Sequence, residues 1–386
     1  MDETVSDRVR AVIRAASRSQ AAFAEQVGLA PDKLSKSLNG VRRFSSLDLA
    51  LIAEATDVTV DWLLTGRQAT RPAVAARTTA VGAPYRDTIE AITQRFTAAY
   101  DVLSLLNRAP ALPPLPRLST DELGYVDQGA ELARWALDQL ARKGSGPVSE
   151  QQTDELVASW ERAFGVDVAV TDLPPQLDGL AWQADGLRLI LTRRTDNWTR
   201  QRFTLAHELG HILACDAQEL VADSKVAPGR QPEPTEVRAN VFAANFLLPA
   251  DELRAAAGDL TENGFARLVT RFGVSPSALA ARLNTLGLID SVTRDTFRRR
   301  TTAECHIAVE MMDGYLRRVS LADRERFPLR LVRQLYRAYE EGETTLRPLA
   351  ALLQEDVEEL HDLLSPANEP ALSNGTTSEG EPVFQP

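Results

Sequence analysis

Residues 200–211 read RQRFTLAHELGH, and the chain continues as ILA to residue 214. The apolar residues in this stretch recur at helical spacing, which predicts a helix. Side chains four residues apart lie on one face of a helix, so His207 and His211 can reach one metal ion from the same side. Glu208 lies beside them, where a carboxylate can accept a proton from water that the metal activates. The chain has only four histidines, and two of them lie in this motif.

A catalytic zinc usually takes three protein ligands and keeps one position for water, so a third ligand is expected. The spacing favours Glu236, in a helix that follows two prolines, that Thr235 would cap and that runs to about Leu248. Asn240 shares a face with Glu236 and could orient a ligand. Other carboxylates follow the motif and remain alternatives: Asp216, Glu219, Asp223 and Glu233. Asp216 could ligate only if the motif helix turned back at its end.

Two blocks of this region together resemble the ImmA/IrrE family of metallopeptidases. The first is residues 200–211, and the second is EVRANVFAA at residues 236–244, followed by LLP at residues 247–249. The resemblance covers roughly residues 150–290. It implies zinc ligation by His207, His211 and Glu236, with Glu208 as the catalytic acid and base. It also implies an endopeptidase that cleaves or inactivates a partner transcriptional repressor and so induces stress-response or mobile-element genes. Manganese or iron would fit the same three groups.

The second informative segment is residues 19–40, SQAAFAEQVGLAPDKLSKSLNG, which predicts a helix, a tight turn and a helix. Ala24 is small where two helices must cross closely, and Gly28 permits the positive backbone angle of the turn. Leu34 and Leu38 give the second helix a buried pair at i, i+4 spacing. With flanking helices predicted over residues 5–16, 46–55 and 59–64, this region resembles the Xre/Cro helix-turn-helix class, down to DWLLTG at residues 61–66.

In that class the second helix enters the major groove with its N-terminal residues toward the bases. The candidate DNA contacts are Asp32, Lys33 and Lys36 at or near bases and Gln20, Arg42 and Arg43 at phosphates. Residues 1–70 carry nine basic and nine acidic groups, so no strong nonspecific attraction to DNA is expected. DNA binding would need a homodimer for useful affinity, and docking onto a repressor is the alternative role for this bundle.

The rest of the composition fits an intracellular regulator or enzyme. A chain of 386 residues predicts two to three domains, and a net charge of −11 argues against coating of nucleic acid along its length. Cys215 and Cys305 give no disulfide framework and are interpreted as buried, reduced thiols. The sequence shows no signal-peptide pattern and no apolar run of membrane length, which indicates a cytoplasmic protein without membrane contact.

The predicted fold is mainly α (α+β), with an N-terminal five-helix bundle, a zincin-like peptidase core around a small β-sheet, and a helical C-terminal region. The predicted domains are residues 1–67 (helix-turn-helix), 68–118 (linker and helix), 119–290 (metallopeptidase with a helix-turn-helix-like segment), 291–365 (helical) and 366–386 (disordered tail). Helices are expected over residues 85–106, 120–142, 149–164 and 329–364, and strands over residues 166–171, 180–183 and 187–192. A further strand is expected over residues 305–311 and would contain His306, which is interpreted as a core histidine. A second group that polarises the peptide carbonyl often assists the metal. His306 and Tyr125 are available for this role, but both are interpreted as structural.

Three functional hypotheses follow from these observations. The first is a zinc protease that cuts a repressor in trans. The second is a DNA-binding transcriptional regulator whose metal site is structural or sensory, and the third is a phage-encoded or antitoxin-type module that acts by binding alone. Glu208 favours the first, because a purely structural metal site needs no carboxylate beside its first histidine.

Overall fold

The computed structural model describes residues 4–15, 19–56, 58, 60–65, 86–109, 111–116, 123–184, 186–216, 221–224, 233–258 and 260–365. The chain divides into two compact units, Met1–Pro72 and Ala73–Pro386, and each is described by itself. The predicted linker over residues 68–84 and the predicted disordered tail from residue 366 lie outside the described residues.

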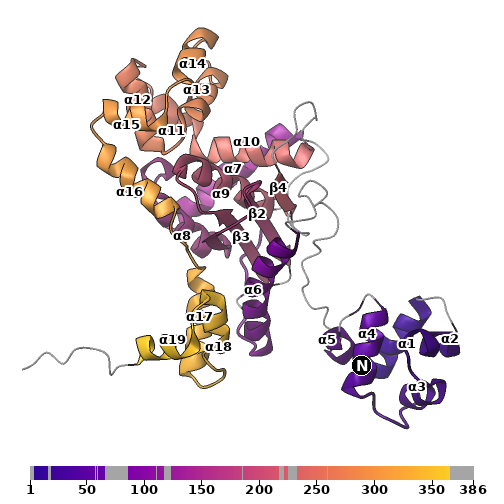
Figure 1. Cartoon of the computed structure of the whole chain (residues 1–386). Coiled ribbons are helices and arrows are strands. Elements are labelled where there is room, and N and C mark those ends of the chain that lie inside the picture. Colours follow the sequence, from indigo (N-terminus) through magenta and orange to yellow (C-terminus); the bar gives the residue numbers. More distant parts are fainter. Residues whose placement is uncertain are drawn as a thin grey trace, which may run out of the picture. The chain divides into compact units, whose positions relative to one another are not determined.

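The described part of the N-terminal unit forms five short helices (Figure 1): α1 (Val5–Ala15), α2 (Gln20–Gln26), α3 (Pro31–Leu38), α4 (Ser46–Ala55) and α5 (Val60–Thr65). These are the five helices that the sequence predicts. Phe23 and Ala24 of α2 are fully buried, and Leu34 and Leu38 of α3 pack into the same core. Gly28 has a φ of +68° in the turn between α2 and α3, a backbone conformation that glycine adopts without steric cost.

The second unit consists of helices around one small sheet. Before the sheet come α6 (Arg86–Leu105), α7 (Tyr125–Arg142), a 3-10 turn (Val148–Glu150) and α8 (Thr153–Phe164). The two candidate-ligand segments lie on α9 (Trp198–Leu213) and α10 (Pro234–Leu247). The helices that follow are α11 (Ala250–Ala256), α12 (Glu262–Phe272), α13 (Pro276–Thr285), α14 (Ser291–Phe297), α15 (Thr302–Ala308), α16 (Met312–Ala322), α17 (Leu329–Glu340), α18 (Arg347–Leu353) and α19 (Val357–Leu364).

The sheet has the strand order β1-β3-β2-β4, with β1 (Asp167–Thr171), β2 (Leu177–Ala184), β3 (Leu187–Arg193) and β4 (Val221–Ser224). β1 pairs parallel to β3, while β2 pairs antiparallel to both β3 and β4. The sequence predicts the first three strands but not β4, which has only four residues and pairs with β2 through an irregular register. So short a strand gives too few residues for an alternating pattern to show.

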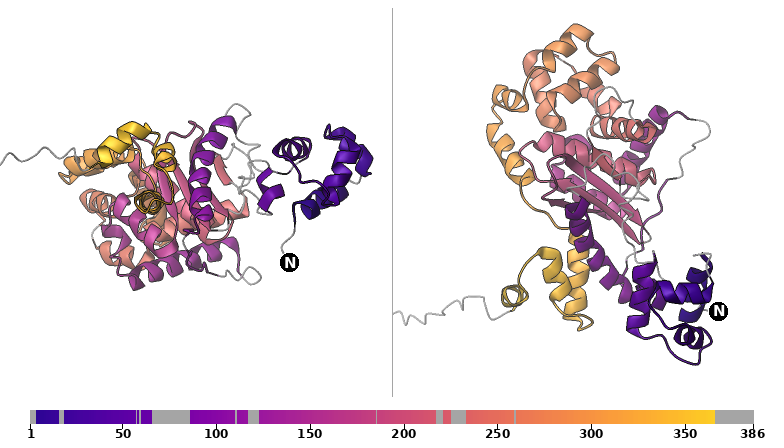
Figure 2. Two further views of the ribbon diagram at one scale, coloured as in Figure 1. Left: turned by 90° about the horizontal axis from the view of Figure 1, so that it is seen from below. Right: turned by 45° about the vertical axis from the view of Figure 1, so that its right-hand side comes forward.

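The sheet is buried on both faces. Successive side chains of a strand point to opposite sides of a sheet, and here each side faces its own hydrophobic core. Ala181 and Ile190 face the core formed by α7 to α10, α12 and α13. Their neighbours Leu180, Trp182 and Leu191 belong to a second core, formed with α6, α17 and α18. Figure 2 shows helices on both faces of the sheet. Helices on both sides explain why each of β1, β2 and β3 has a run of consecutive buried residues rather than an alternation of buried and exposed ones.

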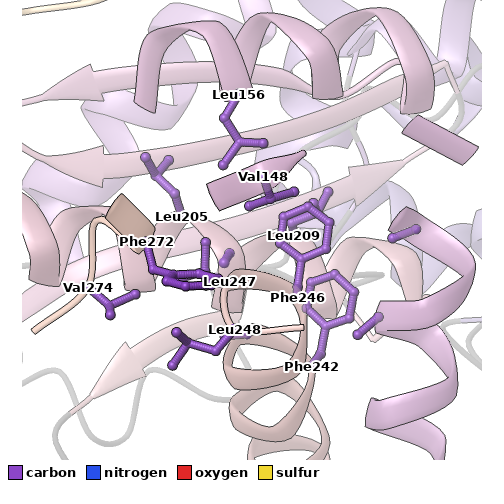
Figure 3. Close-up of a cluster of buried hydrophobic side chains, with 14 of the residues drawn as sticks. Val148, Leu156, Leu205, Leu209, Phe242, Phe246, Leu247, Leu248, Phe272 and Val274 are labelled. Carbon is purple, nitrogen blue, oxygen red and sulfur yellow. The ribbon is translucent and has the colours of Figure 1, made fainter. Parts of the chain in front are cut away.

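The first of these cores holds α9 and α10 against each other and against α12 (Figure 3). Leu209 of α9 lies beside Phe246 of α10, and the rings of Phe246 and Phe242 stack 5.4 Å apart. Leu205 of α9 lies on the side of Phe272 of α12. Each fully buried side chain of this size contributes about 1.5–3 kcal/mol of hydrophobic stabilisation. This packing makes α9 and α10 a rigid pair, on which the candidate ligands are carried.

Three local predictions are wrong. Residues 305–311 do not form a strand, because Thr301 and Glu304 form a capping box that starts α15. Residues 149–164 are not one helix; a 3-10 turn ends at Glu150 and α8 begins at Thr153. Cys215 is exposed rather than buried, because it lies in the turn after α9, whereas Cys305 is buried as expected. Among the described residues, no helix combines the length and apolar character needed to cross a membrane.

Candidate metal centre

His207, His211 and Glu236 converge on one point between α9 and α10. The Nε2 atoms of the two imidazoles are 3.1 Å apart. One carboxylate oxygen of Glu236 lies 3.3 Å from the Nε2 atom of His207, and the other lies 3.3 Å from that of His211. The structure therefore brings together the three residues that the sequence proposes as ligands, at a site where a single cation could contact all three.

The close approach of the two helices depends on Gly210, the fourth residue of the motif. A Cβ atom at this position would lie 2.9 Å from the ring of Phe242 and 3.4 Å from the Cα atom of Ala239. The first distance is shorter than side chains tolerate, so a larger residue would push α10 away. Gly210 thus sets the distance across which Glu236 reaches the two histidines.

The start of α10 places Glu236 in the first helical turn. Pro234 occupies the first helical position, and Glu233 precedes it without a side-chain capping bond. The predicted cap at Thr235 is therefore wrong, because the fixed backbone angle of proline favours a helix start at Pro234 itself. The alternative ligand Glu233 precedes the helix and is not in the cluster, while Glu219 and the side chain of Asp223 lie outside the described residues.

The electrostatics of the cluster favour a positive charge at its centre. Burial opposes protonation of His211, but hydrogen bonds to Asp216 and Glu236 outweigh burial and raise its pKa to about 9. Burial alone would raise the pKa of Glu236, yet hydrogen bonds with His207 and His211 hold that pKa well below its usual range. Two imidazoles and one carboxylate are a donor set that zinc takes in catalytic sites, so the residues present fit this ion.

Each imidazole has a polar partner at its Nδ1 atom, which turns Nε2 toward the centre of the cluster. Asn240 Oδ1 lies 3.2 Å from His207 Nδ1. Asn240 is the residue that the sequence proposes for orienting a ligand. Asp216 Oδ2 lies 3.4 Å from His211 Nδ1. Such contacts fix the tautomer and the ring orientation of metal-binding histidines and make the ligand more basic.

Asp216 is the functional residue whose position sequence reasoning missed. Cys215 adopts a φ of +58°, so the chain reverses after α9 and the Asp216 amide donates to the carbonyl of His211 at 3.0 Å. The chain does turn back at the end of α9, but the Asp216 carboxylate reaches Nδ1 of His211 rather than the point where the three candidate ligands converge. Arg238 of α10 donates to Asp216 and, at 2.6 Å, to Gln128 of α7. Because a cysteine rarely marks a left-handed turn, the sequence gives little sign of this reversal.

Glu208 is completely buried against strand β2. A Cβ atom at Gly179 of β2 would lie 3.1 Å from both the Cγ and Oε1 atoms of Glu208 and 2.6 Å from the Cγ2 atom of Thr204. The absence of a side chain at Gly179 therefore makes the space in which the Glu208 carboxylate sits. Nothing in the sequence around Gly179 indicates this contact.

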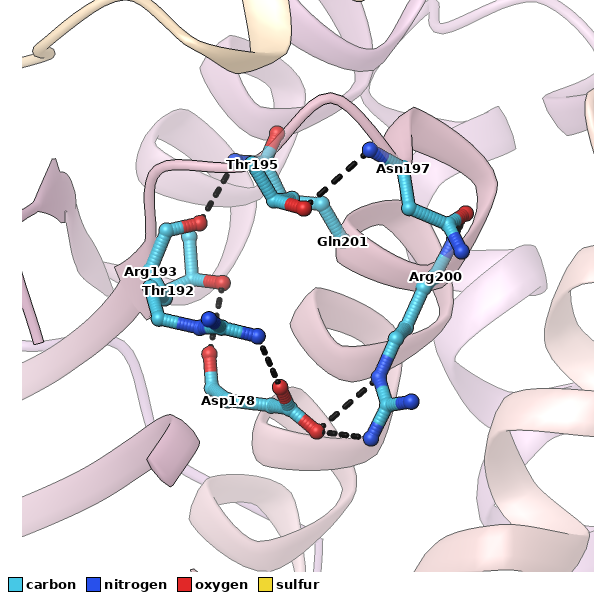
Figure 4. Close-up of polar contacts among 7 residues, drawn as sticks. All are labelled: Asp178, Thr192, Arg193, Thr195, Asn197, Arg200 and Gln201. Atoms are coloured by element: carbon cyan, nitrogen blue, oxygen red, sulfur yellow. Dashed lines mark hydrogen bonds and ion pairs between the residues drawn. The ribbon is translucent and has the colours of Figure 1, made fainter. Parts of the chain in front are cut away.

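The N-terminal end of α9 is fastened to the sheet by Asp178, the neighbour of Gly179 (Figure 4). Its carboxylate accepts hydrogen bonds from Arg193 of β3 at 2.8 Å and from Arg200 of α9 at 2.9 Å. Gln201 of α9 donates to the carbonyl of Arg193 at 2.9 Å. These bonds hold the motif helix at a fixed position over β2, and with it the position of Glu208.

An open groove of about 930 Å³ runs along α9, α10 and α13. Phe203 and Asn240 line it, and they lie one helical turn from His207 and Glu236 respectively. The groove is connected to the candidate ligands through Asn240, which contacts His207, but none of the three ligands and not Glu208 is among its lining residues. Arg200, Arg282 and Arg300 also line the groove, and none of its described lining residues is acidic.

The two residues considered as a second electrophile have other neighbours. His306 packs against Trp198 and Tyr315 in the interior, as expected for a core histidine. The ring of Tyr125 lies 5.3 Å from the guanidinium of Arg238 and is half exposed.

The predicted DNA contacts lie at the surface of the N-terminal unit. Gln20, Asp32, Lys33, Lys36 and Arg43 are exposed. Lys36 is 3.4 Å from Asp32 on the same helix. Arg42 is partly buried and lies 2.7 Å from Asp48, so its charge is already paired within the fold.

His207, Glu208 and His211 form an H-E-x-x-H motif, and the two histidines with Glu236 form a candidate metal site. Residues 161–284 match the family model of the IrrE N-terminal-like domain, a peptidase family. The matched segment contains the whole sheet together with α9 and α10, and therefore includes Glu208 and all three candidate ligands. No curated protein is similar enough to match the chain.

Proposed function

We propose that this protein is a zinc-dependent endopeptidase that cleaves or inactivates a partner transcriptional repressor. The observation that carries the proposal is the convergence of His207, His211 and Glu236 within 4.8 Å of one another, inside a domain that matches a peptidase family. Glu208 follows directly on the first ligand, in the position that peptide hydrolysis requires of a general base.

His207, His211 and Glu236 would hold the metal, with Asn240 and Asp216 fixing the two imidazoles. Zinc with these ligands supplies a Lewis acid that polarises a peptide carbonyl and makes water more acidic. The Glu208 carboxylate takes a proton from the water that attacks the carbonyl carbon, and then gives it to the departing amine nitrogen. The buried position of Glu208 keeps bulk water away from the carboxylate and strengthens its interactions with the reacting groups.

A protein segment is the substrate that the site favours. The groove that reaches Asn240, the contact of His207, has the volume and the largely apolar lining that suit side chains of an extended peptide. Phe203 and Ala244 would contact apolar side chains, and the arginines of the groove would favour acidic ones.

We propose that the N-terminal unit binds DNA, or docks onto the repressor, through α3 and the residues that follow it. The exposed Lys33 and Lys36 on α3 and Arg43 after it support this role. Zero net charge over residues 1–70 means that binding relies on this local cluster and on dimerisation of the chain.

The substitution Glu208→Gln tests the proposed activity. We expect the variant to keep its metal and to lose about 10²–10⁴-fold in cleavage rate, because the amide cannot accept the proton. Wild type and variant are compared in cells by mass spectrometry of newly formed protein N-termini, and the best substrate is then tested with purified protein. Glu131→Gln, on the exposed face of α7, is the matched control and should cleave normally.

Two outcomes would contradict the proposed activity. Cleavage by Glu208→Gln at the wild-type rate would remove Glu208 from the mechanism. Identical N-termini in wild type and variant, with metal bound in both, would instead favour a transcriptional regulator or binding-only module with a structural or sensory metal site.

A further inference from the structure

A second cavity of about 660 Å³ lies away from the metal centre, between α8, α9, α12 and α16. Four arginines line it: Arg202, Arg267, Arg271 and Arg318. We call it the arginine cavity. Glu150 is the one carboxylate among its lining residues in the described part of the chain, and it lies 3.6 Å from Arg271 at the rim. The cavity therefore carries a surplus of positive charge.

Arg202 is the innermost of the four arginines, with only 3% of its surface exposed. It donates to the carbonyl of Val148 at 3.0 Å and to the hydroxyl of Thr153 at 3.3 Å, and both acceptors are neutral. Its Nε atom is buried without a hydrogen-bond partner, and no carboxylate of the described residues pairs with it. Burial and the neighbouring charge of Arg318 lower the pKa of Arg202 to about 10.

Arg318 is the second arginine that has only neutral contacts. It donates to Gln152 Oε1 at 3.0 Å and to the carbonyl of Thr270 at 3.2 Å, and its Nη1 atom lies 3.5 Å from Nε2 of His306. Its guanidinium lies 4.8 Å from the centre of the Trp198 ring. None of the described carboxylates is within ion-pair distance of it. Two buried or half-buried cations that face one cavity without a counter-ion are costly, because desolvation removes the water that would stabilise them.

We propose that the arginine cavity binds an oxyanion, namely a phosphate group, which is either free phosphate or the phosphate of a nucleotide. Guanidinium groups offer paired N–H donors that match phosphate oxygens, so one anion would satisfy the donors of Arg202 and Arg318 together. The volume lies within the range of small-molecule sites, and Trp198, Leu268 and Met311 supply apolar surface for an attached organic group.

This site is separate from the proposed peptidase chemistry. Arg202 and His207 are five residues apart on α9, so their side chains point to different faces of the helix. The anion would therefore bind on one side of the motif helix while the metal and the groove lie on another. The proposal does not depend on whether the protein cleaves a substrate.

Calorimetric titration of the full-length, metal-loaded protein with sodium phosphate, AMP and adenosine tests the proposal. We expect phosphate or AMP to bind and adenosine not to bind. Arg318→Gln should weaken that binding about tenfold or more, since a hydrogen bond to a charged group is lost. Arg317→Gln is the matched control, because Arg317 is the exposed neighbour on α16 and does not line the cavity. The exposed Arg267→Gln gives a second weakened variant should Arg318→Gln fail to fold.

Phosphate can also bind a metal ion, so the Glu236→Ala variant separates the two sites. Retained affinity in that variant, with weakened affinity in Arg318→Gln, supports the arginine cavity. Tighter binding of AMP than of phosphate identifies a nucleotide as the source of the anion, and equal affinities identify the free ion. The proposal is overturned if neither anion binds, if Arg318→Gln binds as wild type does, or if Glu236→Ala abolishes binding.

Discussion

The metal centre and the exposed face of α3 both consist of polar side chains on helices, but they are built in opposite ways. In the metal centre each imidazole is held at both nitrogens, and the partners Asn240 and Asp216 are themselves fixed by α9 and α10. On α3, Lys36 meets only Asp32, and both side chains are more than half exposed. Surface pairs of this kind contribute little to stability. The candidate ion site thus has its polar contacts within the chain, whereas the proposed binding surface on α3 would gain its contacts only from a partner.

The strongest test of this contrast removes the carboxylate that closes the metal centre. Glu236→Ala should lower zinc affinity by more than about a hundredfold, because even groups outside the ligand set change affinity by roughly 10–100-fold. Elemental analysis of the purified variant measures the loss. Glu233→Ala, three residues earlier, is the control and should keep its zinc. Full zinc content in Glu236→Ala would mean that another carboxylate, with Asp216 next in line, is the third ligand.

A smaller effect is expected from the partner of His211. Asp216→Asn should weaken zinc binding by about 10–100-fold, because it removes the charge that orients and polarises the imidazole. Competition with a chromophoric chelator measures the affinity directly. Asp251→Asn, at a fully exposed position on α11, should leave the affinity unchanged. An unaltered affinity in Asp216→Asn would show that α9 alone orients His211.

The surface of α3 should respond more weakly than the metal centre. Replacing Lys33 and Lys36 by alanine should lower the affinity for operator DNA. The slope of log affinity against log salt concentration should also become shallower, by about one unit for each phosphate that the protein no longer neutralises. Gel-shift titrations at several salt concentrations measure both quantities, with Lys143→Ala as the control in the other unit. If DNA affinity does not change, the surface is better explained as a docking site for protein.

The pH dependence of the metal-free protein tests the contacts of His211 without an ion. The pKa of His211 rises from 6.5 to about 9 in the folded protein, so its stabilising contribution is complete below pH 6.5 and is lost as the pH rises through 9. Melting temperatures of chelator-treated protein should therefore fall between pH 6.5 and 9. The fall should be smaller in His211→Gln, which cannot be protonated. Equal curves for both proteins would show that His211 does not retain its proton in the metal-free fold.

Much of the metal centre could be predicted from the sequence because its parts are local. The spacing of His207 and His211 fixes one face of a helix, and the second motif fixes the helix of Glu236. The same reasoning missed Asp216 and Gly179, because their roles depend on a left-handed turn at Cys215 and on the distance between β2 and α9. Both arise from tertiary packing, which residue types alone do not encode.

The fold shows the same division. Long periodic helices and the strands at the centre of the sheet are predictable, since burial imposes a regular pattern on them. Strand β4 is too short to predict, and the sequence predicts a strand in place of α15 because seven residues are too few to distinguish a helical period from a strand. In that segment the capping box of Thr301 and Glu304 is the better guide.

Gly179 has one further consequence for how such a protein could change over time. A Cβ atom at this position would press on Thr204 and Glu208, and none of the three atoms nearest to it belongs to a candidate ligand. A single replacement in the strand would therefore disturb the proposed general base directly and leave His207, His211 and Glu236 in place as candidate ligands. Descendants of this kind would keep the full H-E-x-x-H signature and yet survive only as binding proteins.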